Sequence, residues 1–408
     1  MQAWHNPYGQ PEVSAAAWRR GSDGVVPMVS SDHALRNFRH FPVEAQRSAQ
    51  AAAEDREQRL RTIIKKRSGK AAKLSVEASH RLRRLLGDDN WTELRDLMRQ
   101  ERMTVRDLLQ PPQGLESSYD SLNQARRRKA KAFLRSRDIR REAIVAIAGD
   151  YHEAIADVFA ADENISRGFH LSNNLDKWLS LSPFHDRALP WGVFEPDDSE
   201  NPHRWEVFRP PFFGFNFGFV PVRNDNFVVD RLHTLNPSVG DVGISITMED
   251  GDAGDFDYAS GDAFSAIAFA FVPPATGLVE VLIDAQCVEA THRLETTDEW
   301  GWSNSHTTQQ NFLMLDVLHP SVAEPSYAEM SNLDETTDDD ESFHQEKLTR
   351  GTHYFAQLFS AGPVPAGQSV VVCAGTRSFD KSGTNDVSID STSDFRWYIS
   401  SVEVRISP

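Results

Sequence analysis

Between Pro42 and Ala161, apolar side chains recur every three or four positions, the spacing that places them on one face of an α-helix. A first helix is predicted from Pro42, a favoured first-turn residue, to a stop at Gly69. A second helix is predicted from a cap at Ser75 to a stop at Gly87. Because each helix has an apolar stripe, these helices are expected to pack against another layer of the protein.

Two further helix boundaries are predicted in the same region. Asn90 has a side chain suited to a helix cap and is expected to begin a third helix. A longer helical stretch is predicted from about Ser118 to Ala161, with an interruption near Gly149.

From Phe212 onward the hydrophobic period changes to two, which is typical of β-strands with one buried face. Phe213, Phe215, Phe217 and Phe219 alternate with small or polar residues and are interpreted as core. Since no helix of crossover length lies between the strands, we predict an α+β fold with segregated parts. An N-terminal α-helical region is followed by a C-terminal antiparallel β-sandwich or jelly roll. Later strands are predicted at 242–248, 263–272, 277–287, 311–317, 354–359, 369–374, 387–389 and 395–406.

The last predicted strand contains a change of parity. Trp397 and Val402 are both apolar, yet strict alternation would point them to opposite faces of the sheet. A β-bulge at Ser400 and Ser401 would return both side chains to the core.

The sequence therefore predicts four segments. Residues 1–41 form an extended, flexible arm, and residues 42–161 form a basic helical domain. Residues 162–211 are a connector rich in Pro and Trp that packs on the sandwich, and residues 212–408 form an acidic β-sandwich domain.

Charge is divided unevenly between the two halves of the chain. Residues 1–150 contain 29 Lys and Arg against 19 Asp and Glu, a charge of +10. Residues 151–408 contain 14 against 41, a charge of −27, within 408 residues of net charge −17. Such asymmetry favours separate partners for the two halves or attraction between them.

Cysteine content and the N-terminus say less about function. Cys287 and Cys373 lie in apolar strand ends and are interpreted as buried thiols, although a disulfide between them stays open. No apolar run follows Met1, and no stretch is long enough to span a bilayer. We expect a protein without a membrane span that is cytoplasmic, or exported or particle-associated without a cleaved signal peptide.

An acidic loop is the first candidate site. Asp250, Asp252, Asp255 and Asp257 lie close together, and carboxylate oxygens are the ligands that Ca²⁺ prefers. The spacing does not fit an EF-hand, and a solvated loop between strands explains the same residues. Ca²⁺ is the only cofactor that the sequence suggests. An oxygen-rich turn is also predicted at residues 380–386.

Aromatic residues provide a second candidate. Trp300 and Trp302 lie beside Asn304 and His306, and a tryptophan ring next to polar groups suits the stacking of a sugar ring. The alternative is that both rings cover the end of the sandwich core.

A basic helix provides a third candidate, a surface for an anionic partner. Arg126, Arg127, Arg128, Lys129 and Lys131 are consecutive or nearly so, and cations also gather near residues 65–67 and 81–84. The acidity of the whole chain disfavours nucleic acid. We instead expect these charges to meet the acidic half of the same or a neighbouring subunit.

Catalytic signatures were sought and not found. The sequence contains no phosphate-binding glycine loop, no nucleophile elbow and no zinc-protease motif. We predict a non-enzymatic structural or interaction protein, in which the helices assemble or anchor the molecule and the sandwich binds a ligand or partner. Protein partners or self-association are favoured, as in a component or cargo of a virion, tail or contractile apparatus. A carbohydrate-binding or carbohydrate-active protein is the first alternative, and nucleic-acid binding through the basic helices is the second.

Overall fold

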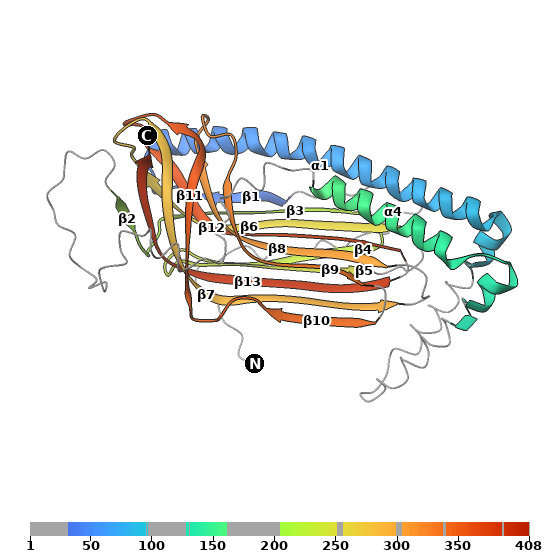
Figure 1. The fold of residues 1–408 in the computed structure, drawn as a ribbon. Coiled ribbons are helices and arrows are strands. Elements are labelled where there is room, and N and C mark those ends of the chain that lie inside the picture. Colours follow the sequence, from blue (N-terminus) through green and yellow to red (C-terminus); the bar gives the residue numbers. More distant parts are fainter. Residues whose placement is uncertain are drawn as a thin grey trace.

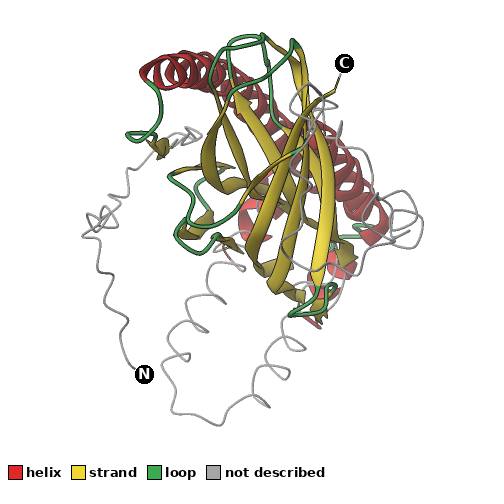
Figure 2. Ribbon diagram, turned by 90° about the vertical axis from the view of Figure 1, so that its left-hand side faces the viewer, coloured by secondary structure: helices red, strands yellow, loops and turns green. Residues whose placement is uncertain are grey.

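The computed structural model describes residues 32–94, 96, 128–129, 131–160, 205–250, 256–298, 304–337, 340–385 and 387–407. Two antiparallel β-sheets, sheet A and sheet B, face each other as a β-sandwich, and two helices lie along the outer face of sheet A (Figure 1). Seen from the side, both helices lie on one side of the strands (Figure 2). The predicted antiparallel sandwich is therefore confirmed.

Sheet A has the strand order β1-β3-β6-β12-β8-β9. Its strands are β1 (Asp32–Asn37), β3 (Gly214–Arg223), β6 (Asp257–Phe271), β8 (Ser305–Leu318), β9 (Ser326–Thr337) and β12 (Val370–Thr384). The segment expected to be an arm thus contains β1, which pairs with β3.

Sheet B has the strand order β10-β7-β13-β5-β4, and two further strands pair with its central members. β11 (His353–Val364) pairs with β7, and β2 (Glu206–Phe208) pairs with β13. The remaining strands are β4 (Phe227–Asn236), β5 (Asp241–Asp250), β7 (Gly277–Asp298), β10 (Glu341–Glu346) and β13 (Val387–Ser407).

The strands are longer than the sequence pattern predicts. β7 has 22 residues and β13 has 21, so the strands predicted at 387–389 and 395–406 are one element. The bulge predicted at Ser400 and Ser401 is confirmed, because the pairing of β13 with β7 shifts between Ile399 and Ser401. Trp397 and Val402 consequently both face the core and are fully buried.

The helices correct three predictions: the break between Gly69 and the cap at Ser75, which both lie within one helix, the interruption near Gly149, and the cap at Asn90. α1 (Val43–Leu86) runs straight through Gly69 as one helix of 44 residues, and it ends at Gly87, whose φ is 79°. α4 (Arg141–Ala160) runs through Gly149, and the chain turns before it at Asp138, whose φ is 55°. A helix-interior glycine costs about 1 kcal/mol, less than the packing of the residues around it contributes.

The third wrong boundary is the cap predicted at Asn90. Residues 88–94 are already helical, and Asn90 lies within this turn. Its side-chain amide donates a 2.8 Å hydrogen bond to the carbonyl oxygen of Leu86, so it closes the end of α1 instead of opening a new helix.

The phenylalanine stripe at the start of the sandwich is only partly core. Phe219 is buried, whereas Phe215 and Phe217 are half-buried and Phe213 is 63% exposed. Phe212, which the period-two pattern left out of the stripe, is buried in the main core. The pattern was correct within β3 and wrong at the turn before it.

The sandwich interior holds two apolar clusters with polar side chains between them. Along β13, Ser391 and Ser393 lie between Phe395 of one cluster and Ile389 of the other. The turn predicted at residues 380–386 is mostly strand, because β12 continues to Thr384. Asp380 points into this polar band, accepts a hydrogen bond from Ser393, and has a pKa raised well above its usual value by burial.

The helices share a core with the sheet. Ile64 and Leu82 of α1 and Phe159 of α4 belong to the same buried cluster as Tyr258 and Phe379 on the outer face of sheet A. The first turns of α1 pack through alanines on β6 and β12 in a separate cluster. The described helices therefore cover sheet A instead of forming a hydrophobic core of their own.

Candidate functional site

The solvent side of α1 carries a line of cations. Ile64, Ala71, Ala78 and Leu82 are buried in the core that α1 shares with α4 and sheet A, and a residue two positions later lies about 200° around the helix. Those later positions are cationic or histidine, and all are exposed: Lys66, Lys73, His80 and Arg84. We call Arg59, Lys66, Lys70, Lys73 and Arg84 the basic stripe; it extends about 37 Å, and Glu77 is the acidic residue on the same side.

The basic stripe belongs to a helix that is fixed at several points. The Arg56 guanidinium pairs with Asp316 of β8, and its Nη2 donates to the carbonyl oxygens of Val317 (2.8 Å) and Val322 (2.9 Å). Ser75 donates a 2.7 Å hydrogen bond to the carbonyl oxygen of Phe256. Because the buried side of α1 is held by these contacts, the exposed side has a defined orientation before any partner binds.

A shallow groove accompanies the basic stripe. It has a volume of about 390 Å³, and Val76 within it is 46% exposed. Val76 is therefore an accessible apolar side chain among polar and charged ones. The groove is lined by Ala72, Lys73, Val76, Glu77, His80 and Arg84.

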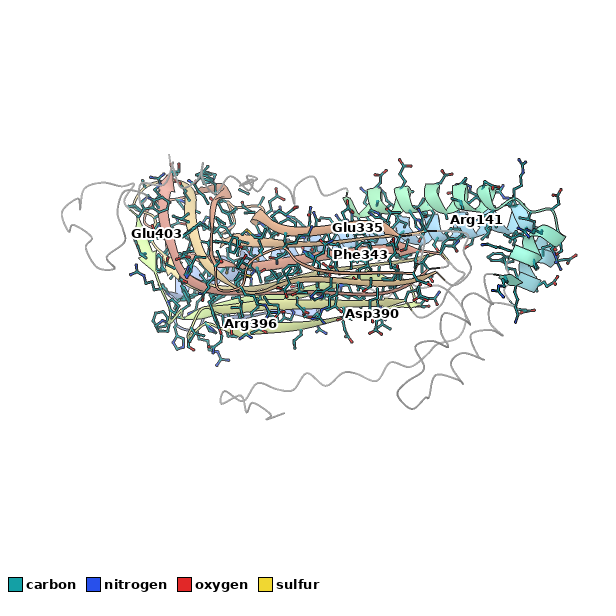
Figure 3. All side chains as sticks on the ribbon, turned by 60° about the horizontal axis from the view of Figure 1, so that its bottom comes forward. Arg141, Glu335, Phe343, Asp390, Arg396 and Glu403 are labelled. Atoms are coloured by element: carbon teal, nitrogen blue, oxygen red, sulfur yellow. The ribbon has the colours of Figure 1, made fainter. Side chains whose placement is uncertain are left out.

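The outer face of sheet B has the opposite charge. Asp390 of β13 lies directly between Glu249 of β5 and Glu295 of β7, and all three carboxylates are exposed. Figure 3 shows Asp390 and Arg396 on the side of the sandwich away from α1 and α4. Among the described residues, outward-pointing carboxylates outnumber cations here: Asp230, Asp241, Glu249, Glu289, Glu295, Glu346, Asp390 and Asp394 against Arg293 and Arg396, with Arg350 paired to Glu289.

Like charges directly opposite each other on a sheet are unfavourable. Glu249, Asp390 and Glu295 carry the same charge, and the outward cations nearest to them along the strands are Arg293 of β7 and Arg396 of β13. Arg396 is already paired with Asp241 at 2.6 Å. We call this set of outward residues on β4, β5, β7 and β13 the acidic face. A cationic partner would relieve its repulsion.

The edge of the acidic face is apolar. Val228 is 51% exposed and Leu232 is 66% exposed, and Asp230 lies between them on the same side of β4. β4 is the last strand of sheet B. The edge therefore offers two exposed aliphatic side chains beside a carboxylate, a pattern found where surfaces dock.

A second polar cluster lies where α4 meets the ends of β8 and β12. His152 is buried, and its Nδ1 is 2.9 Å from Asn304 Oδ1. His306 Nδ1 is 3.0 Å from Thr336 Oγ1, and its Nε2 is 3.2 Å from Asp334 Oδ1. Among the described residues, His152 Nε2 has no hydrogen-bond partner.

Burial controls the pKa values of this cluster. It lowers the pKa of His152 to about 4, although the hydrogen bond to Asn304 acts in the opposite direction. Burial also lowers the pKa of His306 and of Lys381, while Asp334 opposes both shifts. The adjoining cavity has a volume of about 10 Å³, too small for anything larger than a water molecule. We interpret the cluster as part of the contact between α4 and sheet A, which we call the seat of α4.

The residues proposed for sugar binding are only partly described. Asn304 and His306 lie in the cluster beneath α4, where His152, Thr336 and Asp334 occupy their hydrogen-bonding atoms. Trp300 and Trp302 lie outside the described residues. Sugar binding at this end of the sandwich stays a prediction.

The acidic loop is likewise partly described. Asp257 is buried at the start of β6, and its carboxylate accepts hydrogen bonds from Asn224 and Asn226. Asp250 is half-buried at the end of β5, whereas Asp252 and Asp255 lie outside the described residues. Within the described part of the chain, no three His, Cys, Asp or Glu side chains are placed to hold a metal ion. Ca²⁺ binding by the whole loop stays a prediction.

The remaining residues predicted from the sequence are those of the basic helix and the two cysteines. Arg128, Lys129 and Lys131 are exposed, and Arg126 and Arg127 lie outside the described residues. Cys287 and Cys373 are buried thiols that are not joined in a disulfide.

The two thiols are far from a disulfide arrangement. Cys287 lies in the sandwich core, whereas Cys373 lies between sheet A and α1. No described helix is long and apolar enough to cross a membrane.

Sequence reasoning found only the ends of the basic stripe. The clusters near residues 65–67 and 81–84 were noted, but the predicted stop at Gly69 divided them between two helices. Lys70 and Lys73 were missed for the same reason. The signal that could have found them is the seven-residue spacing of Arg59, Lys66 and Lys73, which stays nearly in line along one helix.

Comparisons with known proteins add little. No protein-family model matches the sequence, and the search of curated proteins found no match. A carbohydrate-binding module, TmCBM61 in complex with β-1,4-galactotriose, is 8% identical, with a TM-score of 0.12 over 49% of this chain and 96% of that chain. Arthrobacter globiformis T6 isomalto-dextranase complexed with panose is 12% identical, with a TM-score of 0.14 over 50% of this chain and 36% of that chain. Similarities this low carry no argument about function.

Proposed function

We propose that this chain is a non-enzymatic interaction protein that docks an acidic protein surface on the basic stripe of α1. One observation carries the proposal: the side of α1 opposite its buried residues is lined by exposed cations along about 37 Å. The contacts of Arg56 and Ser75 fix that side outward. The β-sandwich serves as the rigid support of the helix, and a component of a larger particle is the context that this arrangement suits.

An acidic protein surface is favoured over nucleic acid. The whole chain has a net charge of −17, which repels a polyanion at long range. At about 0.15 M salt the Debye length is about 8 Å, so a short local contact with the stripe survives this repulsion better than a long polymer does. Val76 in the groove also suits an apolar side chain more than a phosphate.

Binding of a labelled poly-L-glutamate peptide short enough to contact only the stripe, followed by fluorescence anisotropy on the full chain, tests the proposal. The stripe variant Lys66→Gln, Lys70→Gln, Lys73→Gln should bind the peptide about tenfold more weakly, because each exposed pair contributes about 0.5 kcal/mol. The control variant Lys131→Gln, Arg135→Gln, Arg140→Gln removes the same charge from exposed positions outside α1. It should bind within about twofold of the unchanged chain.

Two outcomes would refute the proposal. Equal weakening by both variants would mean that net charge, and not the stripe, attracts the peptide. Tighter binding of a duplex DNA oligonucleotide than of the peptide, with a steep salt dependence, would assign the stripe to nucleic acid. Circular dichroism of each variant checks that the helix content is unchanged.

A further inference from the structure

The two charged surfaces of this chain lie on opposite sides of the sandwich. α1 packs on the outer side of sheet A, and the acidic face is the outer side of sheet B (Figures 1 and 3). The interior of the sandwich separates them, so the basic stripe of one molecule is unable to reach the acidic face of the same molecule. Any contact between these two surfaces has to join different molecules.

The surfaces match in length and charge. α1 runs parallel to the strands and past their ends, and the basic stripe extends about 37 Å (Figure 1). β4 and β5 have 10 residues each, which corresponds to about 34 Å. Carboxylates recur along the strands of the acidic face, at Asp390 and Asp394 of β13 and at Glu289 of β7, and are opposite in charge to the cations of the stripe.

They also match in their apolar parts. Val76 is exposed in the groove of α1, and Val228 and Leu232 are exposed at the edge of the acidic face. Asp230 stands between the two β4 side chains, as Lys73 and Arg84 stand beside Val76. An aliphatic contact bordered by opposite charges on each side gives a docking surface both affinity and orientation.

We infer that the acidic partner of the basic stripe is a second copy of this chain, bound through its acidic face. The inference rests on the proposed function of the stripe and adds the identity of the partner. Leu232 of one copy packs against Val76 of the next, and the stripe lies along the strands that carry the carboxylates.

This contact is heterologous, since it joins two different surfaces. Each molecule keeps one unused stripe or one unused acidic face after the first contact. Repetition of the contact produces open chains, or rings if the rotation between copies closes. A closed two-fold dimer is not expected, because the two surfaces point in opposite directions.

The expected contact is weak. A stripe about 37 Å long and about 10 Å wide covers roughly 400 Å² per partner, half of the about 800 Å² in a standard interface. Association is therefore expected at micromolar concentrations or above. It should be strongest near 0.1 M salt, where the repulsion between molecules of net charge −17 is screened, and lost near 1 M, where the Debye length is about 3 Å.

Sedimentation velocity of the full chain at several concentrations tests the inference. The acidic-face variant Glu249→Gln, Glu295→Gln, Asp390→Asn keeps the shapes of the side chains and removes their charge. The stripe variant and the acidic-face variant should each be monomeric where the unchanged chain forms dimers and larger species. An equal mixture of the two variants should form one-to-one dimers and nothing larger, because only one intact stripe and one intact face can meet.

The outcomes separate the inference from the proposed function. A chain that stays monomeric at every salt concentration, or an acidic-face variant that still associates, would overturn the inference. If poly-L-glutamate binding still depended on the stripe in that case, the proposed function would stand and the partner would be another acidic protein. If peptide binding were independent of the stripe, both the proposed function and the inference about the partner would be wrong. The control variant of Lys131, Arg135 and Arg140 should associate like the unchanged chain.

Discussion

The two outer faces of this sandwich use the same strand geometry in opposite ways. On β12, at the centre of sheet A, the outward residues Val371, Cys373 and Phe379 are buried beneath helices. On β13, at the centre of sheet B, the outward residue Asp390 is exposed and Thr392 is half-buried. One face is therefore structural, while the other is available to a partner.

The difference is visible in the sequence of each strand. β12 begins with a run of apolar residues on both parities, which is typical of a strand covered on both sides. β13 alternates apolar with polar residues, which is typical of a strand covered on one side. The outer face with few apolar residues is also the one on which carboxylates outnumber cations, and this links the packing of the fold to its proposed partner.

Truncating an outward side chain should lower the free energy of unfolding far more on the covered face of sheet A than on the open face of sheet B. Phe379 is 5% exposed beneath α4, and Phe379→Ala should lower the free energy of unfolding by about 3–5 kcal/mol. Thr392→Ala, at an outward position of β13, should change it by less than about 0.5 kcal/mol. Urea unfolding followed by tryptophan fluorescence measures both. Equal losses would mean that the helix layer contributes little to the stability of sheet A.

A second prediction compares buried and exposed ion pairs on α1. Arg56→Met leaves the Asp316 carboxylate, whose side chain is 7% exposed, without its partner, and should cost about 3 kcal/mol. Arg59→Met removes a pair with Asp55 in which both side chains are 55% exposed, and should cost less than about 0.5 kcal/mol. Thermal unfolding of the two variants distinguishes them. A loss in Arg59→Met as large as in Arg56→Met would show that the helix, and not its seat on β8, responds to the change.

Local chemistry made part of this fold predictable. The parity of Trp397 and Val402 located the bulge in β13, because both side chains had to reach one core. The stop at Gly87 was predictable because its φ of 79° is one that glycine adopts without strain. In both cases, the deciding interaction lies within a few residues of the feature.

Long-range packing decided what the sequence pattern missed. Gly69 does not end α1, because the flanking Ile64 and Ala71 are buried on the sheet layer and hold the helix together. Asp380 resembles a turn residue, yet pairing with β6 and β8 keeps it in a strand. Asn304 was predicted beside a sugar, and its partner His152 comes from a helix 152 positions away. No local spacing contains such a contact.

A third prediction concerns this seat of α4 and has its effect only in acid. The pKa of His152 is about 4 in the folded chain and 6.5 when solvated, so the unfolded chain binds a proton first as the pH falls. Above pH 6.5 His152 is neutral in both states and does not reduce the free energy of unfolding. Between pH 6.5 and about 4 the free energy of unfolding falls, because only the unfolded chain binds the proton. His306 and Lys381 lie beside His152 and disfavour a positive charge on its ring. The carboxylates of Asp334 and Asp157 act on Lys381, whose ammonium they attract.

His152→Gln keeps a hydrogen-bonding side chain for Asn304 and removes the titration. At pH 7 its free energy of unfolding should lie within about 1 kcal/mol of the unchanged chain. By pH 4 the variant should have gained up to about 3 kcal/mol relative to the unchanged chain, since each pKa unit corresponds to about 1.4 kcal/mol. Urea unfolding at a series of pH values measures this difference. His353→Gln is the control, because His353 is exposed and pairs with Asp284 on β7, and it should not reproduce the gain in acid. A constant difference between variant and unchanged chain across this pH range would show that folding does not lower the pKa of His152, and that the covered face accepts a charge there as readily as water does.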